Sequence, residues 1–263
     1  MYSNVLALSL LFSVAAAAQT PDKTVVPLTD PARPATVKAS IMSGSITVKA
    51  YEGRDVVVEA RPHANSHHAR EGTMKRIPMN VTGLVVEEEN NVVDVGAQSA
   101  SDLTIMVPAR SSLHLSTIND GDIVVTGVDG EIDVSDINGS VTLNHVSGTA
   151  VAHALNGKVL VVFDRINPQK PMAFSSLNGD VDITFPADLK ATVSIAVDNG
   201  DVFSDFDLQL DARAADTVLT GKREGGKYRV NFDKSVHGTI NGGGQQIQFK
   251  NFMGNVYIRK AAR

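Results

Sequence analysis

The stretch that decides the fold is Asp136–Val159, "DINGSVTLNHVSGTAVAHALNGKV". Asn138-Gly139 returns as Asn156-Gly157 eighteen residues later, and Ser147-Gly148 lies halfway between them. Asparagine tolerates positive φ and glycine adopts it freely, so each pair is suited to a sharp turn. Between the turns, apolar and polar side chains alternate, which is typical of half-buried strands. The stretch therefore predicts short strands joined by evenly spaced turns.

This spacing belongs to a longer internal repeat. Glycines occur every nine residues, at positions 121, 130, 139, 148 and 157, and apolar residues follow each of them two and four positions later. A third apolar column lies seven residues after the first four glycines: Val128, Ile137, Val146 and Leu155. Identical columns are what parallel stacking requires, because like side chains then lie above one another. We predict an all-β, single-domain parallel β-solenoid with about 18–22 residues per coil and Asn-Gly turns at one edge.

Three other repeat structures fit the pattern less well. Successive antiparallel hairpins also use Asn-Gly turns, but they rarely keep one column pattern in every unit. A left-handed helix of hexapeptides has eighteen-residue coils, but the apolar positions here keep no period of six. A calcium-binding β-roll shares the nine-residue period, but the residue after the glycine includes Lys158, which cannot bind calcium.

The turns at one edge form a series that we interpret as a structural ladder. Its members are Asp120, Gly121, Asn138, Gly139, Asn156, Gly157, Asn178, Gly179, Asn199 and Gly200. Stacked asparagine side chains can hydrogen-bond to one another along the solenoid axis. A polar ligand-binding edge is the functional alternative, but the accompanying glycines indicate that backbone geometry determines the sequence here.

The organisation of the 263-residue chain follows from its composition. Residues 1–18 resemble a secretory signal peptide, because an apolar run precedes an A-x-A cleavage pattern, and no transmembrane segment is expected in the mature chain. Residues 19–37 contain four prolines and are expected to be an extended lead-in. Residues 38–260 are expected to form the repeat domain, with a polar loop at 61–80 and a closing coil near Gly254–Ile258.

Charge is unevenly distributed along the chain. The net charge is −5, yet residues 221–263 contain nine Lys or Arg and only two acidic residues. We expect this basic end to pack beside acidic strands such as residues 85–95, with an anionic lipid or polymer as the alternative partner. A sequence pI near 5.8 and the lack of interleaved aromatic residues argue against nucleic-acid binding.

The absence of cysteine from an exported chain of this size is typical of a bacterial envelope protein.

Candidate catalytic and metal-binding residues are weak. His63, His67 and His68 have spacings that could bind a metal, but the flanking sequence favours a solvated loop. Carboxylates are numerous in the repeat: Asp133, Asp136, Asp164, Asp180, Asp182 and Asp201. Asp182 and Asp180 are expected on one side of a strand with Asp201 one coil above, but we interpret them as turn and solvent-facing residues. We predict no catalytic residue, cofactor or metal.

The elements "LSTINDGDIVV", "VSDINGSVTL" and "FSSLNGDVDITFPADLKA" resemble the bacterial adhesin-like β-strand-repeat family, also called toastrack-like. The likeness extends from about Lys38 to Lys260. That family is a domain of unknown function in exported and envelope proteins. The resemblance implies the repeat fold and envelope association, and it implies no catalytic residue that could be carried over to this chain.

These observations favour a non-catalytic, adhesin-like interaction module. We expect it to be exported to the periplasm, the cell envelope or the extracellular space, where its partner is an unidentified protein, glycan or anionic polymer. One alternative is a polysaccharide-acting β-helix enzyme, a lyase or hydrolase, with a loop-lined groove around Asn167 to Lys170 and Asp188. The other is a structural scaffold that assembles through the ends of the solenoid.

Overall fold

The computed structural model describes residues 21–63, 82–211, 220–224, 227–231 and 235–262. The expected signal peptide, at 1–18, and most of the expected loop, at 61–80, lie outside these residues. All regular secondary structure in the described ranges is β-strand, which confirms the all-β class. Over the same ranges, no helix is long and apolar enough to cross a membrane.

The strands follow one another closely along the chain. The first eleven are β1 (Asp22–Val26), β2 (Ala35–Ser43), β3 (Ile46–Tyr51), β4 (Val56–Pro62), β5 (Leu84–Glu89), β6 (Val92–Ala97), β7 (Ser101–Pro108), β8 (Ser111–Asn119), β9 (Ile123–Thr126), β10 (Asp129–Asp136) and β11 (Val141–Ala154). The others are β12 (Val159–Ile166), β13 (Met172–Asn178), β14 (Val181–Phe185), β15 (Ala191–Asn199), β16 (Val202–Ser204), β17 (Leu208–Leu210), β18 (Thr220–Glu224), β19 (Lys227–Asn231), β20 (Val236–Ile240), β21 (Gln245–Met253) and β22 (Val256–Lys260).

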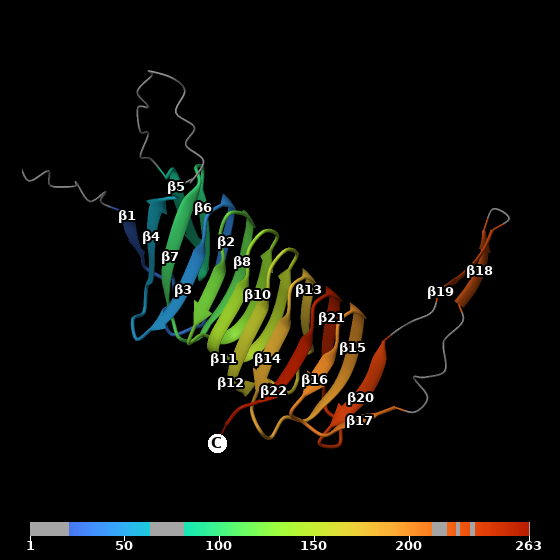
Figure 1. Cartoon of the computed structure of the whole chain (residues 1–263). Coiled ribbons are helices and arrows are strands. Elements are labelled where there is room, and N and C mark those ends of the chain that lie inside the picture. The colour runs from blue at the N-terminus through green and yellow to red at the C-terminus, as the bar shows by residue number, and fades with distance from the viewer. Residues whose placement is uncertain (1–20, 64–81, 212–219, 225–226, 232–234, 263) are drawn as a thin grey trace, which may run out of the picture.

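The strands lie in two rows, which form the two faces of a stack (Figure 1). Face A runs β1–β4–β7–β3–β9–β11–β12–β14–β22–β16. Face B runs β5–β6–β2–β8–β10–β11–β13–β21–β15–β20–β17. Strand β11 belongs to both faces, because it bends near His145, whose φ is 50°.

In the structure, the sequence repeat forms parallel strands that pair in register. Ile123 of β9, Val141 of β11 and Val159 of β12 are direct neighbours, each eighteen residues from the next, and all three are fully buried. The end strands differ, because β4 pairs antiparallel with β1 and β7, β5 with β6, and β20 with β15 and β17. The sheet is therefore mixed, and the predicted purely parallel arrangement is too simple.

The stack does not follow the order of the sequence at either end. The pair β2–β3 lies between β6–β7 and β8–β9, although β6–β7 follows it in the chain. The pair β21–β22 lies between β13–β14 and β15–β16. Figure 1 shows this as red strands between yellow and orange ones. The expected closing coil is thus an inserted coil, hydrogen-bonded on both sides, and the prediction that it closes the stack is wrong.

The inserted C-terminal coil also completes the aromatic core. Phe249 of β21 lies 5.7 Å from Phe174 and 6.4 Å from Phe185, between ring centroids. Phe163 stacks on Phe185 at 5.5 Å. All four rings are almost completely buried. Because the buried rings come from β12, β13, β14 and β21, the last coil fills the core as well as extending the sheet.

The prediction of a third buried apolar column is wrong at two of its four positions. Val128 and Val146 are fully buried, but the exposed fractions of Ile137 and Leu155 are 37% and 41%. The period of nine treats these four positions as equivalent, whereas the coil of eighteen places them at opposite edges. Only the edge without the asparagines turns its apolar residues inward.

Two expectations about the ends of the chain also need correction. The lead-in at 19–37 contains β1, and β2 already begins at Ala35. The basic strand β22 lies far along the stack from residues 85–95, because β14 and β16 are its neighbours on face A. Its Arg259 instead forms a bidentate pair with Asp182, at 2.7 and 2.9 Å.

Candidate functional site

The edge of the stack between the two faces carries a ladder of asparagine side chains. The Asn156 Nδ2 donates to Asn138 Oδ1 at 2.9 Å, and the Asn178 Nδ2 donates to Asn156 Oδ1 at 2.8 Å. One step further, the Asn138 Nδ2 donates to Asn119 Oδ1 at 3.0 Å. The structure thus brings together three of the predicted asparagines and adds Asn119, which the sequence analysis missed.

Two members of the predicted series lie outside this ladder. Asp120 is an extra residue in its turn, with φ of 57°, so Asn119 occupies the stacked position instead. Asn199 pairs in register with Met253, and Asn178 pairs with Met253 from the other side. The inserted strand β21 therefore separates Asn199 from Asn178 and places a thioether between the two amides.

The glycines of these turns are needed because neighbouring coils approach closely. A Cβ atom on residue 139 would lie 2.0 Å from the Gly121 carbonyl oxygen, and one on residue 157 would lie 2.0 Å from that of Gly139. Gly179 and Gly200 meet the same obstacle at 2.3 and 2.0 Å. Close backbone contact along this edge therefore explains the regular spacing of these glycines, and no ligand is needed to account for it.

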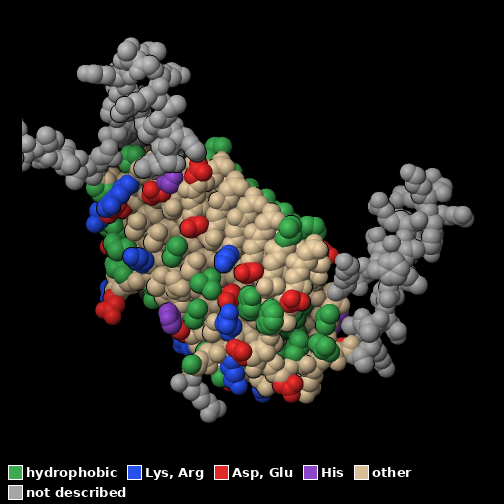
Figure 2. Space-filling model, viewed as in Figure 1, with side chains coloured by type: hydrophobic (Ala, Val, Ile, Leu, Met, Phe, Trp, Pro, Cys, Tyr) green, Lys and Arg blue, Asp and Glu red, His purple; other side chains and the backbone are tan. Residues whose placement is uncertain are grey.

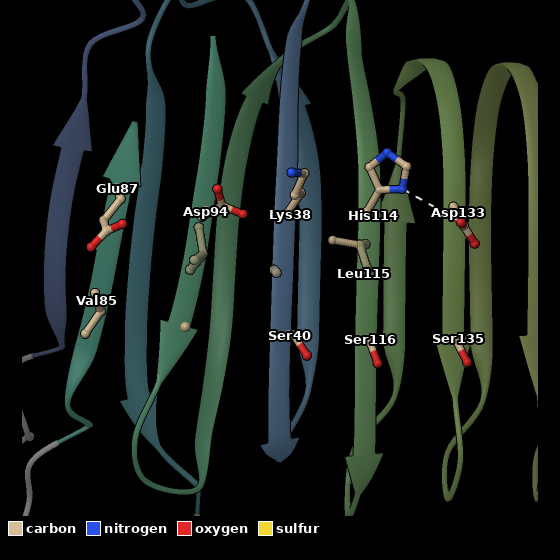
Figure 3. Close-up of a pocket in the computed structure, with 13 residues that line it drawn as sticks. Lys38, Ser40, Val85, Glu87, Asp94, His114, Leu115, Ser116, Asp133 and Ser135 are labelled. Atoms are coloured by element: carbon tan, nitrogen blue, oxygen red, sulfur yellow. Dashed lines mark ion pairs between the residues drawn. The ribbon is translucent and has the colours of Figure 1, made fainter. Parts of the chain in front are cut away.

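Face B carries a shallow groove near its N-terminal end, with a volume of about 640 Å³. Figure 3 shows its lining residues on β5, β6, β2, β8 and β10. A charged row crosses it: Asp94, Lys38, His114 and Asp133 are direct neighbours across four strands. The His114 Nδ1 lies 3.7 Å from Asp133 Oδ2. Because carboxylates lie at both ends of the row, its basic groups are flanked by opposite charge.

A second row in the groove consists of hydroxyl groups. Ser40, Ser116 and Ser135 are neighbours in register, and all three point into the groove in Figure 3. This serine row continues along face B through His153, Ser175 and Lys250. The His153 Nδ1 and Ser175 Oγ are 2.6 Å apart. Neighbouring strands are spaced about 4.8 Å apart, so the row presents polar groups at that repeat.

Beside the serine row runs a row of exposed apolar side chains, here called the apolar row. Its members occupy successive coils: Met42, Ile118, Ile137, Leu155, Leu177 and Phe252. Their exposed fractions range from 37% to 74%. A second hollow of about 590 Å³ lies over this row and shares Ser135 with the first groove. Contiguous exposed apolar surface of this kind is typical of interaction sites.

Face A presents a different surface. Figure 2 shows hydrophobic side chains interspersed with charged ones over β14, β22 and β16. The rings of Phe203 and Tyr257 stack there at 5.1 Å, and the Arg259 guanidinium lies 5.1 Å from the centroid of the Tyr257 ring. The hydrogen bonds from Arg259 to Asp182 raise the pKa of the guanidinium. These charges are paired within the protein.

Asp180, Asp182 and Asp201, which could have formed an acidic patch, are not arranged as one. Asp182 pairs with Arg259, and the Asp180 carboxylate accepts a hydrogen bond from the Asn255 backbone N–H at 2.9 Å. Asn255 Oδ1 in turn accepts one from the Asp201 backbone N–H at 2.9 Å. Since Asn255 comes from the inserted coil, Asp201 does not lie one coil above Asp180. Two carboxylates for acid–base chemistry are therefore not brought together here.

The opposite edge of the stack, where the loops vary, has a hollow of about 440 Å³ that reaches Asn167. Two acidic residues line it, and both are paired: Arg165 Nη2 lies 2.9 Å from Asp129 Oδ2, and Lys170 Nζ contacts Glu131 Oε1. Of the residues around which the enzyme alternative expected a groove, Asn167 lines this hollow and Asp188 does not.

Each histidine in the described ranges has a different polar partner. The His63 Nδ1 lies 2.7 Å from Asp102 Oδ1, and the His145 Nδ1 lies 2.8 Å from Asp164 Oδ1. His67 and His68 lie outside the described residues. Within the described ranges, no group of three or more His, Asp or Glu residues could hold a metal ion.

Comparisons with known proteins identify a family. A family model described as Toastrack DUF4097 matches residues 19–241. No curated protein matches the chain. Among solved structures, a candidate cell adhesion protein from Clostridium sporogenes ATCC 15579 is 9% identical, with a TM-score of 0.41, covering 92% of this chain and 100% of that one. A candidate adhesin from Bacteroides fragilis NCTC 9343 is 13% identical, with a TM-score of 0.35, covering 93% and 98%. Similarity at this level carries no argument about binding.

Proposed function

The chain belongs to the Toastrack DUF4097 family, and from this premise we propose that it is a two-sided β-solenoid that works as a non-catalytic interaction module. We propose further that it is exported to the cell envelope or the cell surface, and that face B is its binding surface. The observation that carries the proposal is the apolar row, which runs beside the serine row over six coils.

The ligand that fits these two rows best is an extended, neutral glycan. A pyranose ring presents hydroxyl groups at its edge and C–H groups on its faces, so it can use both rows at once. The strand stack already holds the polar groups at a repeat of about 4.8 Å, so binding does not have to order them. The charged row holds Lys38 and His114 between the carboxylates of Asp94 and Asp133, which favours a neutral polymer over an anionic one.

A pair of matched leucine variants tests the location of the surface. Leu155 on face B and Leu160 on face A are exposed to similar extents, 41% and 38%. We expect Leu155→Glu to weaken the binding of neutral oligosaccharides by about tenfold or more, because it places a charge in the apolar row. Leu160→Glu should leave the affinity unchanged. Binding would be measured by calorimetry against neutral glucans, mannans and chitin oligomers.

Three results would count against the proposal. Equal loss of affinity in both leucine variants would place the ligand elsewhere, and saturable binding of none of these glycans would overturn the ligand class. If the protein cleaved any of these glycans by hydrolysis or elimination, and Glu131→Gln abolished that activity, the result would instead support the polysaccharide-acting alternative at the hollow near Asn167.

A further inference from the structure

A row of buried polar side chains lies directly inside the apolar row, at the edge that carries the asparagine ladder. In register across face B, its polar members are Thr117, Asp136, Ser176 and Asn251, and the apolar Ala154 lies between Asp136 and Ser176. All of them are buried. The position alternates with the exposed apolar row, because successive residues of a strand point to opposite sides. This row therefore faces the interior, where each polar group needs a partner.

Three members of the row make the same hydrogen bond. The Thr117 Oγ1 donates to the Gly44 carbonyl oxygen at 3.0 Å, and the Ser176 Oγ donates to that of Gly157 at 2.8 Å. The Asn251 Nδ2 donates to the Gly179 carbonyl oxygen at 3.0 Å. In each case the acceptor is the turn glycine of the preceding coil in the stack. These three side chains are therefore donors that bind one coil to the next.

Asp136 occupies a donor position with an acceptor side chain. Its exposed fraction is 2%, and neither carboxyl oxygen has a partner with good hydrogen-bond geometry in the described part of the chain, although the backbone N–H groups of Asn138 and Gly139 lie close enough to act on the carboxylate. The glycine carbonyl that corresponds to its position is that of Gly121. The site of a Cβ on residue 139 lies 2.0 Å from Gly121 O and 2.7 Å from Asp136 Oδ2, so the two oxygens are near each other.

The protonation state of Asp136 decides whether this contact is favourable. An ionised carboxylate only accepts hydrogen bonds, whereas a protonated one carries an O–H donor. Burial, and to a smaller extent the charge of Asp122, raise the pKa of Asp136 from 3.8 to about 7, against the N–H groups of Asn138 and Gly139, which act to lower it. The neighbours in the same row of β8 and β11, Thr117 and Ala154, carry no charge.

We propose that Asp136 is a proton-dependent lock at the ladder edge of the stack. When protonated, its carboxyl group donates an O–H hydrogen bond to Gly121 O and joins β10 to the preceding turn, as Thr117 and Ser176 do in their coils. When the proton leaves to solvent, the donor is lost and a buried carboxylate faces a carbonyl oxygen. The edge beneath the apolar row is then held less firmly.

The sign of the pH effect follows from the folded state holding the proton more tightly. Below pH 3.8 both states are protonated, and the full contribution of Asp136 to stability is present. As the pH rises from 3.8 toward 7, the unfolded chain loses the proton first, and the contribution falls. Above pH 7 both states are ionised, and the contribution is at its lowest.

The test is thermal unfolding of the full chain at pH 5 and pH 8. Asp136→Asn supplies an amide donor at every pH, as Asn251 does in its coil. We expect this variant to melt above the unsubstituted protein, by a margin that grows by about 5 °C or more between pH 5 and 8. Asp120→Asn, at an exposed residue of the same edge, is the matched control and should leave the pH dependence unchanged.

An identical pH dependence in the protein and in Asp136→Asn would overturn the proposal. Carbon-13 NMR of the Asp136 carboxyl in the unsubstituted protein gives an independent test that requires no variant to fold. We expect a titration midpoint near pH 7, and Asp122→Asn should lower it, because it removes the neighbouring charge. A midpoint below pH 5 would show that no lock exists.

Discussion

Replacing Asn156 by alanine should destabilise the stack by breaking the asparagine ladder. Asn156 is an interior member of the ladder, since it donates to Asn138 at 2.9 Å and accepts from Asn178 at 2.8 Å. The substitution removes both hydrogen bonds and leaves one amide donor and one amide oxygen without their partners.

The size of the effect follows from the two lost bonds. A hydrogen bond in a protein contributes about 0.5–1.5 kcal/mol net, so the pair contributes about 1–3 kcal/mol. The ladder lies at the surface, where water can replace part of each bond, so we expect about 1–2 kcal/mol. For a chain of this length, that corresponds to a fall in melting temperature of about 2–8 °C.

The matched control is Asn199→Ala. It removes the same side chain from the same Asn-Gly dipeptide, but the stack neighbour of Asn199 is Met253. We expect this variant to melt within about 1 °C of the unsubstituted protein. Both variants would be followed by circular dichroism during heating and in urea. Equal destabilisation by the two substitutions would refute the ladder, as would an unchanged midpoint for Asn156→Ala.

Three further substitutions test the packing. Gly139→Ala should lower the free energy of unfolding by about 3 kcal/mol in urea titrations, because the new Cβ would lie 2.0 Å from a backbone oxygen. The control is Gly96→Ala, whose Cβ would meet nothing within 4 Å, and it should be neutral or slightly stabilising. Phe174→Ala should cost about 3–5 kcal/mol and broaden the thermal transition, since Phe174 contacts three other buried rings. Asp182→Asn should shift the melting temperature by less than about 3 °C, because its partner Arg259 is half exposed.

The parts of the fold that repeat could be predicted from the sequence. The column of Ile123, Val141 and Val159 recurs every eighteen residues, and in-register parallel pairing is the arrangement that buries such a column. The asparagine ladder between Asn138 and Asn178 follows from the same register. Both features depend only on neighbours that are one coil apart in the chain.

The insertion of the terminal coils could not be predicted in this way. The Gly-x-Val pattern at Gly254 is shared with Gly139, Gly157 and Gly179, so it does not indicate which neighbours this coil will have. Its place is decided by long-range contacts, such as Phe249 against Phe174 and Phe185. Asn199 and Asp201 were misplaced for this reason, because β21–β22 separates them from the preceding coil.

The exposed apolar row and the buried carboxylate were missed for a different reason. The period of nine grouped Ile137 with the buried Val128, although the two lie at different edges of an eighteen-residue coil. Asp136 was grouped with solvent-facing aspartates, yet it shares its strand side with Ile132 and Val134, both of which are buried. Strict alternation along β10 was the signal that could have identified it.

Cross-linking of paired cysteines tests the insertion of the C-terminal coil most directly. The chain contains no cysteine, so each introduced pair is the only one present. Gln248 is the register neighbour of Ala173 on one side and of Ser194 on the other. On mild oxidation, the pairs Ala173→Cys with Gln248→Cys and Ser194→Cys with Gln248→Cys should both form disulfides, because adjacent strands place Cα atoms within reach. The pair Ala173→Cys with Ser194→Cys should not, since a strand lies between them. Rapid cross-linking of that last pair, with none between positions 173 and 248, would contradict the stack described here.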